Sequence, residues 1–253
     1  MSMLQRPLER KRLASALVVA LTLTLAATAA FAEDIAVSPE ARLELVVKGG
    51  SVIVEPGDAK IVRVMGVDAS YRVSANDGRV RVKMSNRNNG ESKIVISIPP
   101  TMPVEINQKI GMVETHELGG PIDVKIRGGF LRMRQSTGDL KVEMKDGVLD
   151  VRDYAGEGKS VSIEGKDGWV DLSLAAKKPG RGIVHLKKGR VNFSSARETV
   201  MQLHAEVEDE GEVITNQPLN RPDPKVLYVT TNRGKTSWDL TVDEGTIRVE
   251  MPR

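Results

Sequence analysis

The sequence predicts an all-β protein built as a β-solenoid, and two observations support that prediction. Glycines recur every nine residues through the middle of the chain, and the residues that follow each glycine alternate between apolar and polar. Alternation with a period of two is typical of a strand with one buried face, and no stretch has the period of an amphipathic helix. β-Branched residues dominate the inward positions, which favours strands further.

The repeat is carried by glycines with a constant spacing of nine residues, Gly111, Gly120, Gly129, Gly138, Gly147, Gly156 and Gly165. Apolar side chains come two residues after the first five of them, at Val113, Ile122, Leu131, Leu140 and Leu149. Four residues after come Thr115, Val124, Met133, Val142 and Val151. Each unit is therefore predicted to be one strand of about six residues and a glycine turn, with these side chains in the core.

The phase shifts by three residues between Ala155 and Gly158, after which the pattern resumes with Val161 and Ile163 inward. Further units are centred on Gly50, Gly78, Gly168, Gly189, Gly234 and Gly245. Their inward side chains are predicted to be Val52, Val54, Val80, Val82, Met84, Val170, Leu172, Leu174, Val191, Phe193, Thr236, Trp238, Leu240, Ile247, Val249 and Met251. We therefore expect one domain over 33–253, with N-terminal strands in 33–110, the most regular repeats in 111–174 and less regular strands in 175–253.

Two architectures can use such units. In a solenoid, two successive nine-residue units form one coil; in an antiparallel β meander or sandwich, they form hairpins. The dipeptides Gly119-Gly120, Gly128-Gly129 and Asp146-Gly147 are typical of hairpin turns and favour the meander. The outward charges favour the solenoid, because opposite charges on facing strands stabilise a pair and like charges destabilise it.

Coils of two units would stack most outward charges on charges of the opposite sign. The stacked pairs would be Glu114 with Arg132, Arg132 with Asp150, Asp123 with Lys141, and Lys125 with Glu143. Only Arg134 above Arg152 would be unfavourable, whereas two-residue hairpins would place four like-charged pairs opposite one another. The β-solenoid with two units per coil is thus the preferred prediction, and the meander is the alternative.

Residues 1–32 have the three parts of a cleavable secretory signal peptide. A basic segment ending at Lys11-Arg12 precedes an apolar run from Leu13 to about Ala27, and Ala30-Phe31-Ala32 matches a cleavage pattern. The run is shorter than the roughly 20 apolar residues of a membrane-spanning helix, so we expect cleavage rather than stable membrane insertion. No Cys follows the run, so the expected product is exported to the periplasm or secreted and is not a lipoprotein.

The net positive charge of the chain is contributed by this N-terminal segment. The net charge of +3 arises from 37 basic and 34 acidic side chains, and the segment 1–32 contains four of the basic and one of the acidic groups. The remainder therefore has 33 of each, so no cationic excess supports nucleic-acid binding. The chain contains no Cys, which excludes disulfides, thiol catalysis and thiolate metal sites.

Two stretches resemble the bacterial putative-adhesin family of exported β-solenoid domains, whose function is largely undefined. The segment 43–54, LELVVKGGSVIV, is similar to the opening strands of that family. The segment 98–106, IPPTMPVEI, is similar to the hinge that leads into its glycine-punctuated array. The resemblance runs from about Leu43 to the C-terminus and is clearest up to Leu174. It implies an envelope solenoid with a binding or scaffolding role, and it transfers no catalytic residue.

The sequence offers no cluster of catalytic or metal-binding residues. His116, His185 and His204 lie far apart, and the acidic run 206–212 after His204 is better explained as solvated than as a cation site. In the calcium-binding nine-residue roll an Asp fills the position that Lys125 and Arg134 occupy here, which excludes that type of site. We therefore predict no catalytic residues, no metal and no cofactor, and we identify no ligand-binding residues.

Exposed aromatic rings are the side chains that most often stack on sugars. Phe193 and Trp238 are predicted to point inward, which leaves Tyr154 and Trp169, beside turns, as the best surface candidates; packing over a corner is the commoner role for both. The predicted function is a non-enzymatic, adhesin-like binding or scaffolding module of the cell envelope, with an envelope protein or a polysaccharide as partner. The alternative is a carbohydrate-active β-helix enzyme, a lyase or hydrolase. Uncovered terminal coils would permit self-association.

Overall fold

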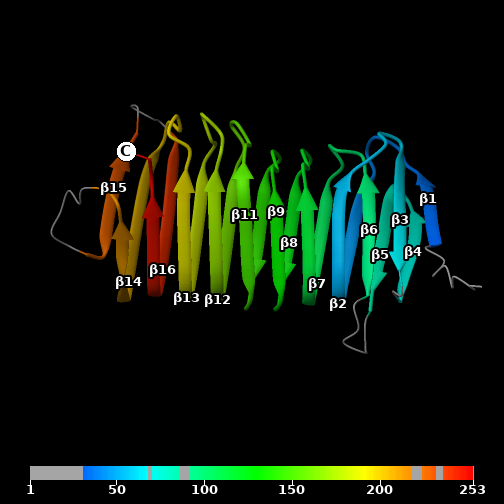
Figure 1. Ribbon diagram of the computed structural model, residues 1–253, viewed down its shortest axis with the longest axis horizontal. Helices are drawn as coiled ribbons and strands as arrows, with labels where there is room; N and C mark the ends of the chain where they lie inside the picture. Colours follow the sequence, from blue (N-terminus) through cyan, green and yellow to red (C-terminus); the bar gives the residue numbers. More distant parts are fainter. Residues whose placement is uncertain (1–30, 68–69, 86–91, 218–223, 232–235, 253) are drawn as a thin grey trace, which may run out of the picture.

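The computed structural model describes residues 31–67, 70–85, 92–217, 224–231 and 236–252, and these residues form sixteen β-strands and no helix (Figure 1). The strands are β1 (Phe31–Ala36), β2 (Arg42–Pro56), β3 (Ile61–Val67), β4 (Tyr71–Asn76), β5 (Arg79–Met84), β6 (Lys93–Ile98), β7 (Val104–His116), β8 (Ile122–Ile126), β9 (Phe130–Arg134), β10 (Leu140–Met144), β11 (Val148–Tyr154), β12 (Val161–Leu174), β13 (Gly182–Ser195), β14 (Gln202–Thr215), β15 (Val226–Thr230) and β16 (Ser237–Glu250). The all-β prediction is confirmed. Residues 1–30 of the predicted export signal, and the predicted turn at Gly234, lie outside the described residues.

The strands stand side by side along the long axis of the molecule, in two rows that face each other across the core (Figure 1). The first row contains β8 and β10, and the second contains β9 and β11. Long strands such as β7 and β12 pass through both rows, so β7 pairs with β8 and β9 while β12 pairs with β10 and β11. These six parallel strands therefore close into a flattened ring.

Neighbouring strands of the ring run parallel, and in its regular part paired residues are separated in sequence by two units of the glycine repeat. Ile122 pairs with Leu140 in the first row, and Phe130 pairs with Val148 in the second. Parallel pairing contradicts antiparallel hairpins in this part of the chain. The three-residue phase shift predicted around 155–158 lengthens the next step by the same amount, because Leu140 pairs with Val161.

The core is a thin aliphatic layer between the two rows. Of the ten inward positions predicted in the repeat, Thr115 is the only polar one, and all ten are at most 3% exposed. In the less regular units the predicted inward side chains that the structure describes are also buried, apart from the half-buried Thr236. Phe193 and Trp238 point inward as expected, with ring centroids 5.6 Å apart. Alternation with a period of two thus located the core correctly.

Glycines form a stacked column at the corner where the chain passes from the first row to the second. At this corner Gly129 has a φ of 96°, in the region that favours glycine. A Cβ atom on Gly129 would overlap the carbonyl oxygen of Gly111, the corner glycine of the neighbouring strand β7. The glycine repeat therefore marks a corner at which neighbouring parallel strands make backbone contact.

Sequence order and spatial order differ at both ends of the array. The strand β2 pairs with β5 and β6 on one side and with β7 on the other. At the other end β16 lies between β13 and β14, parallel to both. Three of the outermost strands, β1, β4 and β15, pair antiparallel to their neighbours. In the part of the chain that the structure describes, no helix is long and apolar enough to cross a membrane.

Candidate functional site

The outer face of the second row carries a line of exposed and half-buried apolar side chains that we call the aromatic stripe. It consists of Met112, Phe130, Val148 and Trp169, one from each of β7, β9, β11 and β12. Each follows a corner glycine directly, so the four side chains are register neighbours spaced by about 4.8 Å. Trp169 is 42% exposed and Met112 is 36% exposed. The stripe is therefore a continuous apolar ledge across four strands.

The Trp169 indole is held in place by polar neighbours while one part of it stays open to solvent. Its Nε1 donates a hydrogen bond to Oδ1 of Asp171 at 2.9 Å, and Asn192 donates its amide to the same oxygen. The Arg190 guanidinium lies 5.3 Å from the centre of the indole ring. Arg132 lies similarly over Phe130, at 5.0 Å. The two aromatic rings of the stripe are thus oriented before any ligand arrives.

A polar groove of about 490 Å³ lies on the same face and continues from Asp171 toward the end of β16. The side chains that line it come from β11, β12, β13 and β16 and include Arg152, Asp171, Asn192, Ser194 and Arg248. They offer hydrogen-bond donors and acceptors of both charges within one shallow depression. The groove therefore suits a ligand with many hydroxyl groups.

Asp150 lines this groove and holds Arg152 of the groove together with Arg132 beside it. Its side chain is 4% exposed, and its carboxylate accepts hydrogen bonds from Nε of Arg132 at 3.0 Å and from Nε of Arg152 at 2.9 Å. Burial of a carboxylate is costly unless charged donors compensate it, which these two arginines do. The pKa of Arg152 is raised above its ordinary value, chiefly by this hydrogen bond.

Tyr154 and Trp169, the two aromatic residues proposed from the sequence as surface candidates, differ in exposure to solvent. Trp169 is exposed, as predicted for a surface ring. Tyr154 is fully buried, so its assignment as a surface candidate was wrong, and the corner-packing role holds instead. Its hydroxyl donates to the carbonyl of Gly138 at 2.8 Å, and burial raises its pKa. Sequence reasoning missed Phe130, although its position directly after Gly129 is equivalent to that of Trp169 after Gly168.

The histidines lie beside separate carboxylates rather than in a common site. His116 lies beside Glu114, and Nε2 of His185 lies 2.8 Å from Oδ1 of Asp243. His204 stacks on Tyr228 with ring centroids 4.5 Å apart. Within the described ranges, no group of three or more His, Asp or Glu side chains has the geometry to hold a metal ion.

Comparisons with known proteins find similarity at the level of solved structures, at low values. No family model matches the chain, and no curated protein matches it in sequence. Its structure is similar to that of a putative cell adhesion protein from Clostridium sporogenes, with 13% identity and a TM-score of 0.39 over 88% of this chain and 100% of that one. A putative adhesin from Bacteroides fragilis gives the same identity, TM-score and coverage of this chain, with 96% of its own length covered. Values this low carry no information about a ligand.

Proposed function

We propose that the chain is a non-enzymatic β-solenoid of the bacterial cell envelope that binds polysaccharide through the outer face of its second row. The observation that carries the proposal is the aromatic stripe beside the polar groove. Sugar rings present apolar C–H faces that pack on aromatic side chains, and their hydroxyls need donors and acceptors nearby. The Trp169 ring supplies the apolar surface for stacking, and Asp171 and Asn192 supply the hydrogen-bonding groups.

The length of this surface also favours a polymer over a single small molecule. The stripe and the groove together cross the strands from β7 to β16, and the parallel register keeps equivalent positions in line. A chain of sugars lying across the strands would meet outward side chains at equivalent positions of successive strands. The β-solenoid is therefore proposed as the scaffold, with two-unit coils that repeat one binding surface.

A binding role is favoured over catalysis by the state of the two carboxylates nearest the stripe. Asp150 is bound by two arginines, and Asp171 accepts hydrogen bonds from Trp169 and Asn192. Glycoside hydrolysis generally requires one protonated and one free carboxylate facing the scissile bond. Carboxylates already held by cations and amide donors serve better to position side chains than to transfer protons.

Export is the second part of the proposal and rests on the N-terminal sequence. Predicted cleavage after Ala32 would remove the first two residues of β1 and leave Glu33 to Ala36 paired with β3. The ion pair between Asp34 and Arg63, at 2.6 Å, would be kept. Fractionation of cells that express the full chain, with N-terminal sequencing of the product, tests this part. Recovery in the cytoplasm with residues 1–32 intact would contradict it.

The two tryptophans provide a direct test of binding. Trp238 is buried and Trp169 is exposed, so a Trp238→Phe variant reports on Trp169 alone. Titration with a panel of envelope polysaccharides is expected to shift the emission of Trp169 to shorter wavelength as a sugar ring excludes water. A Trp169→Ala variant, measured by calorimetry, is expected to bind at least about tenfold more weakly, the scale of an energetically dominant aromatic contact.

The matched control for this test is Tyr228→Ala, which removes an aromatic ring that is 47% exposed in the first row. It is expected to leave polysaccharide affinity unchanged. Equal affinities of the wild type and the Trp169→Ala variant would overturn the assignment of this face. Release of reducing or unsaturated sugar ends during the titration would overturn the non-enzymatic role.

A further inference from the structure

Two adjoining grooves cross the outer face of the first row near the N-terminal end of the array, on the other side of the core from the aromatic stripe. Their volumes are about 290 and 370 Å³, and they share Val46, Lys48 and Arg81. Together they extend over β4, β5, β2, β7 and the end of β8, a distance of about 19 Å. Seven cationic side chains line them, namely Lys48, Arg72, Arg81, Lys83, Lys109, Lys125 and Arg127. We call this surface the cationic groove.

No carboxylate from the described part of the chain lines either of these grooves. Arg81 is paired with Glu44 at 2.8 Å, and Lys125 is paired with Glu143 at 3.4 Å. Among the ion pairs of the described residues, none involves the other five cations. Nε of Arg81 is buried there and has no hydrogen-bond partner within the described structure. The cationic groove thus contains more charged hydrogen-bond donors than nearby carboxylate acceptors among the described residues.

The sheet places several of these cations directly beside one another. Arg72 is the antiparallel partner of Lys83, and the register of Gln108 with Ile126 places Lys109 beside Arg127. Like charges on facing strand positions destabilise a sheet by a few tenths of a kcal/mol to about 1 kcal/mol each. The fold tolerates this cost here, and the adjoining column of Glu44, Glu105 and Asp123 on the same face likewise stacks charges of one sign. The groove is therefore distinguished by its cations without ion-pair partners rather than by like-charge stacking alone.

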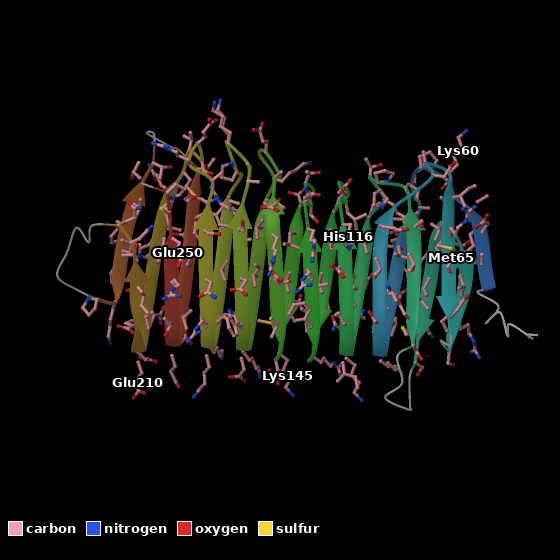
Figure 2. All side chains as sticks on the ribbon, viewed as in Figure 1. Lys60, Met65, His116, Lys145, Glu210 and Glu250 are labelled. Carbon is pink, nitrogen blue, oxygen red and sulfur yellow. The ribbon has the colours of Figure 1, made fainter. Side chains whose placement is uncertain are left out.

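The line of cations continues beyond the groove along the glycine corner. Lys145, Lys166 and Lys187 follow Arg127 in register, each about 4.8 Å further on. Beyond β13 the charges along this edge change from positive to negative. Lys188 of β13 pairs with Glu244 of β16, and Glu244 in turn pairs with Glu210 of β14. Figure 2 shows Lys145 and Glu210 at the same edge of the molecule, with Lys60 at the opposite edge. This column is therefore cationic up to β13, and the exposed Asp146 and Asp167 follow Lys145 and Lys166 directly at the same corner.

We infer that the cationic groove binds an acidic polysaccharide, with the chain of the polymer lying across the strands. Seven cations over about 19 Å exceed what one sulfate, phosphate or carboxylate group can reach, so successive groups on an extended chain are needed. The floor of the groove, Val46 and Asn107, is shallow, and Tyr71 is the single aromatic ring among its lining residues, whereas platforms that hold single-stranded nucleic acid stack successive bases on several rings. A membrane surface would call for several projecting apolar side chains, and at this corner Ile110 is the exposed large one.

This site is separate from the face used in the proposed function, so each can fail without the other. The test measures binding of heparin oligosaccharides and of polygalacturonate to the whole protein by calorimetry at several salt concentrations. A Lys83→Gln, Lys109→Gln, Arg127→Gln triple variant is expected to bind both at least tenfold more weakly. The slope of log affinity against log salt concentration is expected to become shallower by about two to three, because three cation contacts with the polymer are removed.

The matched control carries the same loss of charge at the opposite edge, with Lys60→Gln, Lys178→Gln and Arg197→Gln, and is expected to bind like the wild type. Circular dichroism confirms that both triple variants are folded. Equal weakening by the two variants would overturn the site, as would no binding of either polysaccharide to the wild type. Tighter binding to a 20-nucleotide oligothymidine or to vesicles of anionic phospholipid would overturn the ligand class. Loss of binding on Trp169→Ala alone would assign the polymer to the other face.

Discussion

Two columns of charged side chains cross the same three coils and follow opposite rules. On the face of the second row, Glu114, Arg132 and Asp150 stack in register with alternating sign. Five residues earlier in each coil, at the corner, Lys109, Arg127 and Lys145 stack with one sign. Both columns have the same spacing between strands, so geometry alone does not account for the difference.

The difference separates charges that stabilise the array from charges that serve another purpose. In the face column Asp150 is buried and bonded to two arginines, so its charge is matched locally. The corner column repels itself and depends on solvent and dissolved ions for compensation. Parallel pairing places equivalent residues of successive strands side by side. Attraction between opposite charges is therefore repeated along the face column, and repulsion between like charges is repeated along the corner column.

The largest expected effect comes from disrupting the corner that supports the cationic column. A Gly129→Val variant places a branched side chain at a φ of 96° and against the Gly111 carbonyl. We expect a loss of more than ~4 kcal/mol in the free energy of unfolding, measured by urea denaturation. The control, Gly78→Ala, also has a positive φ, of 70°, but nothing lies within 4 Å of the added methyl, so ~1 kcal/mol is expected. Equal losses would show that backbone contact between coils is unimportant.

Removal of the buried charge tests the face column. An Asp150→Ala variant leaves Arg132 and Arg152 without their shared acceptor, and we expect ~2 to 3 kcal/mol of destabilisation in the same assay. Glu143→Ala is the matched control, because Glu143 also pairs with two cations but is 43% exposed. Its loss is expected to be much less destabilising than the loss of Asp150, because solvent screens an exposed ion pair. A similar cost for both would mean that burial does not distinguish the two carboxylates.

Reversal of one charge in each column is expected to act in opposite directions. Lys109→Glu places an anion beside Arg127, in the groove that Lys48 also lines, and is expected to stabilise the protein by ~0.5 kcal/mol while weakening polyanion binding. Arg132→Glu places an anion between Glu114 and Asp150 and is expected to destabilise it. Thermal melts at low and high salt measure both, and the gain from Lys109→Glu should shrink in about 1 M salt. Destabilisation by Lys109→Glu at low salt would refute repulsion at the corner.

The smallest expected effect concerns pH at the opposite edge. Asp139 accepts hydrogen bonds from the backbone N–H and the hydroxyl of Ser160, which lower its pKa below the ordinary value of 3.8. Its stabilising contribution is therefore complete above that value and is lost as pH falls through the lowered one. Asp139→Asn should lower the melting temperature slightly at pH 7, and the gap from the wild type should close below about pH 4. A gap that stays constant down to about pH 2.5 would contradict this.

The sequence contains enough to place strands and core because both depend on local alternation. Val113, Leu131 and Leu149 stand at one position of a two-unit repeat, and their register in the array follows from it. The charge pattern separated parallel stacking from hairpins for the same reason. The position of Tyr154 could not be obtained this way, because it lies where the phase shifts and parity no longer tells inside from outside.

The order of coils and the cationic groove needed the structure. No local feature of β16 distinguishes the edge it pairs with, since its alternation is the same as that of β13 and β14. The cations of the groove come from segments as distant as Arg72 and Arg127, which only the return of the chain past β2 brings together. The charge count for residues 33–253 came to zero because acidic side chains near the C-terminal end of the array balance in number the cations of the groove.

The placement of β16 between β13 and β14 has a consequence for the order in which the chain can assemble. The strand β16 is later in sequence than β14 and β15 but lies inside the array, so the pair formed by β14 and β15 has no strand to dock on until β16 has been made. At the other end β2, the first long strand, is already a neighbour of both later branches. Growth can thus begin at β2 as translation proceeds, whereas the opposite end must wait for β16. A chain that stops before residue 237 would lack the strand that joins β13 to β14, and both β14 and β15 would be left undocked.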